Sequence, residues 1–296
     1  MINVVITSFR EPKTIGKAIE SFLKQDIKEK YDIIVSAPDE ETLDVVRRYQ
    51  KKDKRIKIFK DPGKGKSFAL NLLLPKLKGR IIVLSDGDVF VKENSLKYIL
   101  EPFKDERVGC VTGRPVSINP RNNIFGYWSH LLCDAGAHEA RLKRARKNEF
   151  LECSGYYWAF RNKVIKDFPK DVAEDTIVPY LFRDRGFSVK YAPEAEVYVK
   201  FPDKWGDFIE QKKRTAKGHE ALAKYYDINK LPRTKSFLNE LKEGYRAFLY
   251  PKNFIEIIYT LLLFPVRLYI WLLVFYQTKL KKDTYKDAWK RIESTK

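Results

Sequence analysis

The sequence contains few residues that could build a metal cluster or a disulfide framework. Only three cysteines and three histidines occur among its 296 residues. Cys110, Cys133 and Cys153 form no CxxC pair and the histidines are scattered, so neither kind of site is expected. We interpret the cysteines as reduced thiols buried in the core of a cytosolic protein.

An N-terminal signal peptide is also not expected, because the apolar opening "INVVITSF" is short and meets Arg10 and Glu11. Acidic residues are outnumbered: 39 Asp and Glu against 58 Lys and Arg give a net charge of +19. This excess of positive charge predicts anionic partners. Nucleic acid is not expected among them, since the acidic and basic residues are interleaved instead of the basic ones clustering on one surface.

Apolar segments alternate with amphipathic segments through the first half of the chain. This alternation predicts an α/β fold with a doubly wound, mostly parallel sheet that binds ligands at the carboxyl ends of its strands. The second half is more mixed, with helices expected at 125–147, within 172–186 and at 204–226, a strand running into a helix at 150–165, and two short strands at 188–202. In the first half, strands are expected at 2–9, 31–37, 55–59 and 80–90, and helices at 12–25, 39–52 and 67–77.

The stretch "DPGKGKSFALN" follows the third expected strand and contains Gly-Lys-Ser. In a P-loop, G-x-x-x-x-G-K-[ST], the first glycine would stand at position 60, which is Lys60. That glycine makes the tight turn around the phosphate, so a P-loop is not expected. The loop is either a plain turn or part of another phosphate chemistry.

Asp86 and Asp88 stand two residues apart in "SDGDV", at the end of the fourth expected strand. In the turn after this strand their carboxylates can converge on one cation. Hard divalent cations prefer carboxylate oxygens and usually keep water or phosphate ligands as well. Together with the neighbouring Gly-Lys loop, this pattern predicts a metal ion that bridges a pyrophosphate.

Two further pairs of polar residues follow along the chain. Glu174 and Asp175 stand in "AEDT" beside apolar residues, and Gln211 and Arg214 stand in "QKKRT". Residues three apart lie on one face of a helix, so the amide and the guanidinium can point into one cleft and hold sugar hydroxyls and phosphate oxygens. Each pair alone would equally suit a solvated helix.

Taken in order, "VVITSFRE", "IIVSAPDEET", "DPGKGKSFALN", "SDGDV", "AEDT" and "QKKRT" resemble the motifs of family 2 inverting glycosyltransferases of GT-A fold. The resemblance covers roughly residues 1 to 220 and is strongest to the cellulose-synthase-like and hyaluronan-synthase-like branch. Thr215 stands where that branch has Trp, so a non-processive, membrane-associated member is expected. The Gly-Lys loop would then be the nucleotide-side loop of this family.

The resemblance implies a role for each matching residue. Asp175 would be the general base. Asp88 and Asp86 would bind Mg²⁺ or Mn²⁺ at the diphosphate. The residues implied at the nucleotide are Thr7, Glu11, Asp39, Lys66 and Asp86, and those implied at the acceptor and the pyrophosphate are Glu174, Gln211 and Arg214.

The expected function is metal-dependent, inverting transfer of a hexose from a nucleotide-diphosphate sugar to a lipid-linked (polyprenyl or dolichyl) glycan or lipid acceptor. GDP-mannose is slightly favoured as donor over UDP-sugars. One carboxylate can deprotonate the acceptor, and a metal with Arg and Lys can neutralise the leaving diphosphate. The alternatives are a sugar nucleotidyltransferase, although "TSFREPKT" lacks a glycine-rich loop, and a basic nucleic-acid-binding module. A monomer is expected.

Residues 1–230 are expected to form the catalytic domain and 231–296 a part that associates with membrane lipids. Segment 254–278 is long and apolar enough to span a bilayer, but Pro265 and Arg267 stand near its middle. We therefore expect a Pro-broken pair of short helices, in the membrane plane or as a shallow hairpin, after an amphipathic interfacial helix at 236–250. A single span and a buried helix are the alternatives.

Basic residues on both sides of this segment favour the cytoplasmic side for both of its ends, and hence for the catalytic domain. They are Lys230, Arg233, Lys235, Lys242, Arg246 and Lys252 before the segment and Lys279, Lys281, Lys282, Lys286, Lys290 and Arg291 after it.

Overall fold

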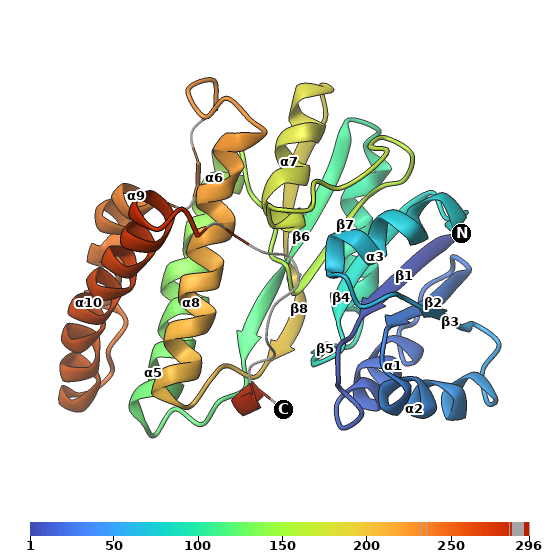
Figure 1. The fold of residues 1–296 in the computed structure, drawn as a ribbon, viewed down its shortest axis with the longest axis horizontal. Coiled ribbons are helices and arrows are strands. Elements are labelled where there is room, and N and C mark those ends of the chain that lie inside the picture. The colour runs from blue at the N-terminus through green and yellow to red at the C-terminus, as the bar shows by residue number, and fades with distance from the viewer. Residues whose placement is uncertain (232, 235, 284, 286–292, 296) are drawn as a thin grey trace.

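A single mixed sheet runs through the computed structural model, which describes residues 1–231, 233–234, 236–283, 285 and 293–295. The strand order is β3-β2-β1-β4-β7-β6-β8-β5, and helices cover both faces (Figure 1). Neighbours among β1 to β4 are parallel, whereas β7 runs antiparallel to β4 and β6. The predicted α/β class with a mostly parallel sheet is thus confirmed. The strands are β1 (Ile2–Thr7), β2 (Tyr31–Ala37), β3 (Ile56–Lys60), β4 (Ile81–Asp86), β5 (Val89–Val91), β6 (Val108–Ser117), β7 (Tyr157–Arg161) and β8 (Ser188–Val199).

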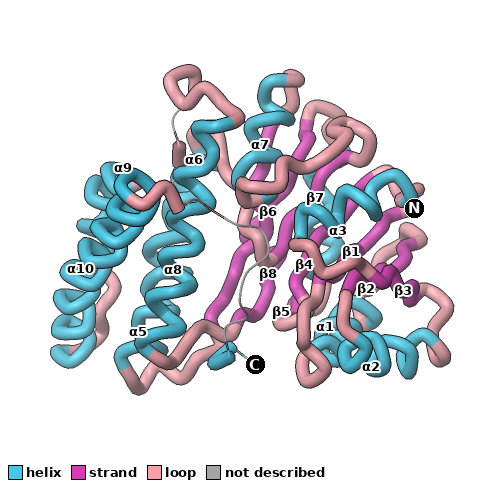
Figure 2. Tube along the Cα trace, viewed as in Figure 1, coloured by secondary structure: helices cyan, strands magenta, loops and turns pink. Residues whose placement is uncertain are grey.

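Helices flank the strands of the sheet (Figure 2), and they pack in three hydrophobic clusters. One cluster lies between the sheet and α1, α2 and α4, a second between the sheet and α3 and α7, and a third between α5, α8 and α10. The helices are α1 (Ile15–Leu23), α2 (Glu40–Gln50), α3 (Lys66–Leu73), α4 (Ser95–Leu100), α5 (Ile124–Leu131), α6 (Glu139–Arg146), α7 (Glu174–Asp184), α8 (Trp205–Glu220), α9 (Phe237–Glu243) and α10 (Phe254–Phe275).

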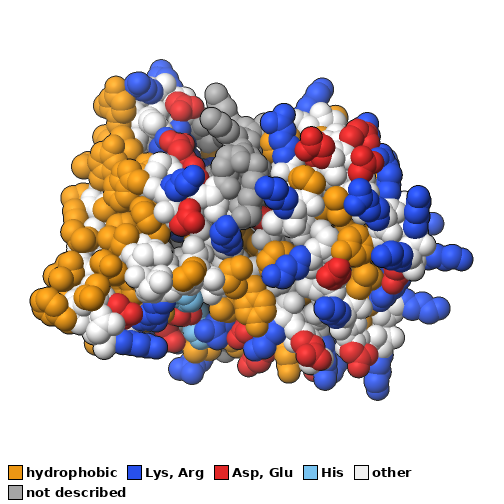
Figure 3. Space-filling model, turned by 90° about the horizontal axis from the view of Figure 1, so that it is seen from below, with side chains coloured by type: hydrophobic (Ala, Val, Ile, Leu, Met, Phe, Trp, Pro, Cys, Tyr) orange, Lys and Arg blue, Asp and Glu red, His pale blue; other side chains and the backbone are white. Residues whose placement is uncertain are grey.

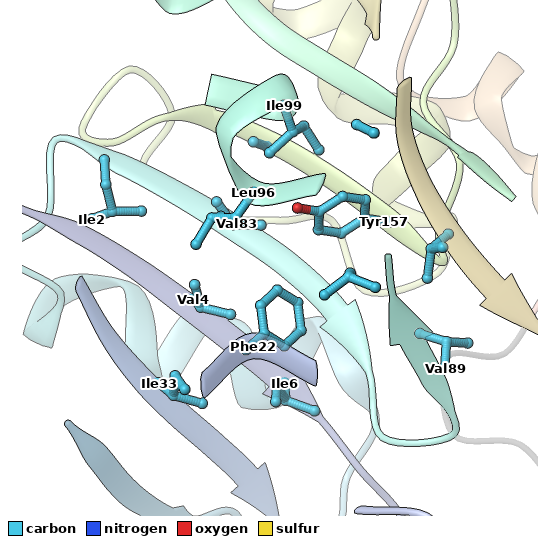
Figure 4. Packing of buried hydrophobic residues seen from close by; sticks show 14 of the residues in the cluster. Ile2, Val4, Ile6, Phe22, Ile33, Val83, Val89, Leu96, Ile99 and Tyr157 are labelled. Atoms are coloured by element: carbon cyan, nitrogen blue, oxygen red, sulfur yellow. The ribbon is translucent and has the colours of Figure 1, made fainter. Parts of the chain in front are cut away.

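Strand β1 shows why both faces of the sheet must be covered. Successive side chains of a strand point to opposite faces. Val4 and Ile6 pack with Phe22 of α1 in the first cluster (Figure 4), while Val5 packs with Leu70 of α3 in the second. A strand with apolar side chains on both faces, such as β1, is therefore stable only between two layers of helices.

Two expectations for the second half are wrong. In the segment 188–202, Ser188–Val199 form one long strand, not two short ones, because β8 pairs with β6 over most of its length and with β5 near its end. In the described segment 162–173, between β7 and α7, the structure has no helix. Instead, the Asn162 side chain donates to the carbonyls of Leu77 and Gly79, and Lys163 takes a positive φ of 66°, which holds the chain in a turn.

Helix α10 continues through Pro265, so the expected Pro-broken pair of helices is wrong. Its N-terminal half is held on the domain by Arg121, which pairs with Glu256 at 2.7 Å, and by Trp128, whose Nε1 donates to the Tyr259 carbonyl at 2.7 Å. Further along, Ile270 and Val274 pack in the cluster shared with α5 and α8. This packing on both sides of the proline offsets its cost of about 3 kcal/mol in a helix interior.

The opposite face of α10 is apolar and exposed, as Figure 3 shows along the left edge of that view. Within the described residues, Phe254–Leu280 is the one helical segment long and apolar enough to cross a membrane, with a mean hydropathy of 2.1. The expected interfacial helix begins as α9 and continues as a 3-10 segment, Gly244–Leu249. Of the expected basic flanks, Lys235, Lys286, Lys290 and Arg291 lie outside the described residues.

Candidate active site

A cleft of about 180 Å³ opens where β1, β2, β3 and β4 end. This is the edge of the sheet at which parallel α/β folds bind ligands. Most of the residues that the sequence assigned to the site line it, namely Thr7, Glu11, Lys66, Asp86, Asp88, Gln211 and Arg214.

Lys66 lies at the centre of the charged groups in the cleft. Gly63 and Gly65 take positive φ values of 69° and 109°, which glycine adopts without strain, and the turn they form places Lys66 at the start of α3. Its Nζ lies 2.8 Å from Asp86 Oδ1 and 2.7 Å from Glu174 Oε1. Burial alone would lower the Lys66 pKa, but the two carboxylates outweigh burial and hold the pKa well above its usual range. Lys66 is therefore a buried ammonium ion that joins two acidic groups.

The ends of β1 and β4 bring a hydroxyl and a carboxylate together. Thr7 and Asp86 are partners in the parallel pairing, and Thr7 Oγ1 donates to Asp86 Oδ1 at 3.1 Å. Next to them, Ser8 Oγ donates to Glu11 Oε2 at 2.6 Å. A Cβ on Gly87 would collide with the side chains of both Ser8 and Glu11. The glycine between the two aspartates thus permits the β1 and β4 loops to meet.

The carboxylates in this part of the cleft suit a cation that is shared with a ligand. Among the described residues, no three His, Cys, Asp or Glu side chains are placed to hold a metal ion by themselves. Asp86 Oδ1 already accepts from Thr7 and Lys66, and Asp88 lines the cleft in the following turn. Mg²⁺ is usually bound by one or two carboxylates together with substrate phosphates, and the donors present here fit that arrangement.

Glu174 and Asp175 are the first two residues of α7, where the helix dipole favours negative charge. Glu174 is only 4% exposed and reaches the cleft through Lys66. Asp175 is half-buried and is not among the described residues that line the cleft. It lies behind Gly155, where an added Cβ would stand 3.1 Å from Asp175 Oδ2. Gly155 precedes Tyr156, which lines the cleft, so Asp175 lies close behind the cleft wall.

Helix α8 contributes Gln211 and Arg214 to the wall opposite the Gly-Lys loop, as their spacing predicted. Gln211 is 6% exposed, and its Oε1 has no hydrogen-bond partner within the part of the chain that the structure describes. A buried acceptor left unpaired costs about 1–3 kcal/mol, which a ligand hydroxyl would relieve. Thr215 Oγ1 donates to the Gln211 carbonyl at 3.0 Å, so this threonine is bonded within its own helix.

Asp39 lies outside the lining of the cleft, at the N-cap of α2. Its carboxylate accepts from the backbone N–H groups of Thr42 at 3.0 Å and Arg10 at 2.8 Å. Burial opposes ionisation, but hydrogen bonds from Thr42 and Arg10 outweigh it and hold the Asp39 pKa below its usual value. Asp39 thus ties the loop after β1 to α2, and its contact with a nucleotide stays a prediction.

Asp61 lines the cleft but was not identified from the sequence. It follows β3 directly and accepts from Ser36 Oγ at 2.9 Å and from the Gly63 N–H at 2.8 Å. Burial raises the Asp61 pKa, and these two hydrogen bonds offset the effect only in part. The sequence contained a signal for this site residue, because Asp61 directly follows a parallel strand, much as Asp86 ends one.

The sequence profile described as "Glycosyltransferase like family 2" matches residues 1–218 of the chain. The chain belongs to this family. It is a glycosyltransferase, as the resemblance predicted, and membership decides against the nucleotidyltransferase and nucleic-acid-binding alternatives.

Among characterised relatives, poly-beta-1,6-N-acetyl-D-glucosamine synthase of Staphylococcus aureus (strain COL) is 25% identical over 251 residues, which cover 80% of this chain and 58% of that enzyme. The enzyme of the same name from Staphylococcus epidermidis is 24% identical over 236 residues, covering 75% of this chain and 55% of that enzyme. The chain therefore matches less than two thirds of the length of these relatives.

Two solved structures share the fold. The mannosyltransferase PcManGT from Pyrobaculum calidifontis, in complex with GDP-Man and Mn²⁺, superposes with a TM-score of 0.59 at 15% identity and covers 95% of this chain and 84% of its own. Residues 1–349 of S. aureus TarS, in complex with UDP-GlcNAc, superpose with a TM-score of 0.52 at 16% identity, covering 84% of this chain and 81% of that one. These likenesses confirm the GT-A fold of this glycosyltransferase.

Proposed function

We propose that this glycosyltransferase moves a hexose, with inversion, from a nucleoside-diphosphate sugar to a lipid-linked acceptor at the cytoplasmic face of a membrane. The observation that carries the proposal is the contact of Lys66 with both Asp86 and Glu174, since it joins the nucleotide side of the cleft to the start of α7. Thr7, Glu11 and Lys66 would bind the nucleotide, and the diphosphate would lie between Lys66 and Arg214.

The cation, Mg²⁺ or Mn²⁺, would be held by Asp88, with Asp86 beside it, and when bound it would neutralise charge on the diphosphate. The residues of the chain have separate tasks. Lys66 and Arg214 place two positive charges beside the leaving diphosphate, where fixed charges stabilise the transition state. Gln211 Oε1 can accept from a hydroxyl of the acceptor.

Asp175 is our candidate for the general base. Inversion needs a proton acceptor on the attacking hydroxyl, and a carboxylate near neutral pH can take that proton as the oxygen attacks the anomeric carbon. An acceptor that reaches Gly155 would bring its hydroxyl to Asp175 Oδ2. Glu174 is occupied by Lys66, which leaves it a supporting role at the acceptor side.

A lipid-linked acceptor is supported by the exposed apolar face that α9 and α10 form beside the catalytic layers. Helix α10 packs along its length on α5 and α8, and α8 carries Lys212 and Lys213. A helix held in this way favours an in-plane membrane contact over a perpendicular span, because a span would draw the charged α8 into the bilayer. Both ends of α10 would then stay on the cytoplasmic side.

A thermal-shift panel of nucleotides and nucleotide sugars would identify the donor. GDP-mannose is tested first, with UDP-glucose, UDP-N-acetylglucosamine, GDP and UDP alongside it, each with and without Mn²⁺. A ligand that binds only the native state raises its apparent stability by RT ln(1 + [L]/Kd). We expect one base to give the larger shift and Mn²⁺ to increase it. If no nucleotide shifts the melting temperature in either condition, the proposal is wrong.

A further inference from the structure

A second cavity lies between α9, α10 and the π-helical segment Leu132–His138 that links α5 to α6. Its volume of about 410 Å³ exceeds that of the catalytic cleft. Ligand pockets typically have about 300–1,000 Å³, whereas packed interiors keep few voids larger than a water molecule. A space of this size calls for an occupant.

The wall of the cavity is mostly apolar. It is formed by Leu131, Leu132, Leu241, Leu263, Phe264 and Leu268, among others. Leu241 and Leu268 are 64% and 48% exposed, so the cavity opens on the apolar face that α9 and α10 present. A bilayer that covers this face would lie directly at the mouth of the cavity.

The charged groups of the wall form two ion pairs and leave one buried donor without a partner among the described residues. Arg267 pairs with Glu240, which also accepts from Trp271 Nε1 at 2.9 Å. Glu243 pairs with Arg246 at 2.9 Å and with Lys143 at 3.3 Å. The two arginines of the wall are thus matched by its two carboxylates, and Lys143 lies outside the lining. In addition, Arg246 Nη1 is buried and has no hydrogen-bond partner among the described residues.

We propose that this cavity binds the hydrocarbon chain of a lipid phosphate, with the phosphate at Arg246. The Arg246 Nη1 donor, which no described residue satisfies, matches a phosphate oxygen, and the apolar wall matches a saturated or prenyl chain. The inference rests on the proposed function for one point only, namely that this lipid is the acceptor. A peptide helix is less suited, because the mouth opens on the surface that a membrane would cover.

The π-helical segment that borders the cavity also packs in the core beside the cleft. Cys133, in the π-helical segment, packs in the same cluster as Tyr156, which lines the cleft. Lys212, next to Gln211 of the cleft, places its ammonium over the rings of Phe201 and Phe208 at 5.2 and 5.5 Å. A lipid seated by its chain would thus lie against a segment that packs next to the catalytic cleft.

The test uses the full chain in a non-ionic detergent and measures binding of dodecyl phosphate and of dodecanol. Gly136 lines the cavity, and a Cβ there would meet only the Leu131 carbonyl, at 3.8 Å, so Gly136→Leu narrows the cavity without a backbone clash. Gly206→Leu, in open space on α8, is the matched control. We expect about tenfold weaker binding of both probes to Gly136→Leu and unchanged binding to the control.

Arg246→Gln tests the contribution of the phosphate head group to binding separately from that of the hydrocarbon chain. This variant should weaken the binding of dodecyl phosphate by about tenfold, because one hydrogen bond to a charged group is lost. The binding of dodecanol should not change. Ala247→Leu, on another wall, repeats the blocking test should Gly136→Leu fail to fold. Equal affinity of wild type and both blocking variants for dodecyl phosphate overturns the proposal. A third outcome separates the cavity from the acceptor. If the enzyme transfers sugar only to soluble sugar acceptors while Gly136→Leu still blocks probe binding, the lipid cavity is supported and the lipid acceptor is refuted.

Discussion

Lys66 and Glu174 form a buried ion pair of 2.7 Å between the first residue of α3 and the first residue of α7. The two residues are 108 positions apart, and their helices leave different parts of the sheet. The pair therefore sets the distance between the N-termini of α3 and α7 beside the cleft. It also makes the site sensitive to the loss of either charge.

Replacing Lys66 with Met should lower the free energy of unfolding by about 3–5 kcal/mol, because Glu174 would remain buried without its cation. Urea unfolding monitored by circular dichroism measures this change. Lys64→Met is the control, since Lys64 is exposed in the same loop. The double variant Lys66→Met/Glu174→Gln should recover part of the loss, and no recovery would show that the two charges are not coupled.

Asp88→Asn should abolish the dependence of donor binding on Mn²⁺ while the fold stays intact. A neutral amide is a poorer ligand for a hard divalent cation than a carboxylate. Titration of Mn²⁺ in the presence of the best nucleotide checks this, with Asp44→Asn on the exposed face of α2 as control. Undiminished transfer in EDTA by the wild-type enzyme would contradict the assignment.

Asp175→Asn should lower kcat by about 10²–10⁴-fold with little change in donor affinity, because only proton abstraction is lost. Steady-state kinetics with a saturating donor measures it. Gly155→Ala should act in the same direction, since its methyl group would stand 3.1 Å from Asp175 Oδ2 and crowd the base. Near-normal turnover of Asp175→Asn would move the base elsewhere, with Glu174 the first candidate.

Asp61→Asn should stabilise the protein at pH 7. Because burial raises the Asp61 pKa, the folded state binds this proton more tightly than the unfolded chain, and the ionised form costs stability above the raised pKa. The cost disappears as the pH falls toward the ordinary value of about 3.9. Thermal unfolding from pH 3.5 to 7.5 should therefore show a gain for the variant that grows with pH. A gain that is constant with pH would exclude this ionisation as its cause.

The exposed face of α10 should bind anionic vesicles. Leu261 and Leu272 are 52% and 58% exposed, and replacing both with Glu should release the protein in a sedimentation assay without lowering donor binding. Leu72→Glu is the matched control, because Leu72 is an exposed leucine on α3. Wild-type protein that stays in the supernatant with vesicles would rule out the membrane contact.

The alternation of strands and helices in the first half, and the position of Asp86 and Asp88 at a strand end, follow from local patterns. Buried parallel strands are apolar at every position, and amphipathic helices repeat every three to four residues. Such patterns are properties of neighbouring residues, so the sequence is sufficient to predict them. The i,i+3 spacing of Gln211 and Arg214 belongs to the same class and was also confirmed.

Contacts between distant segments were decided by the tertiary structure. No local pattern places Lys66 against Glu174, keeps Asp39 out of the lining of the cleft, or puts Gly155 beside Asp175. Helix α10 is the clearest case, because Pro265 argued locally for a break, yet packing on α5 and α8 keeps one continuous helix. Local preferences amount to a few kcal/mol at most, and burial along a whole helix face outweighs them.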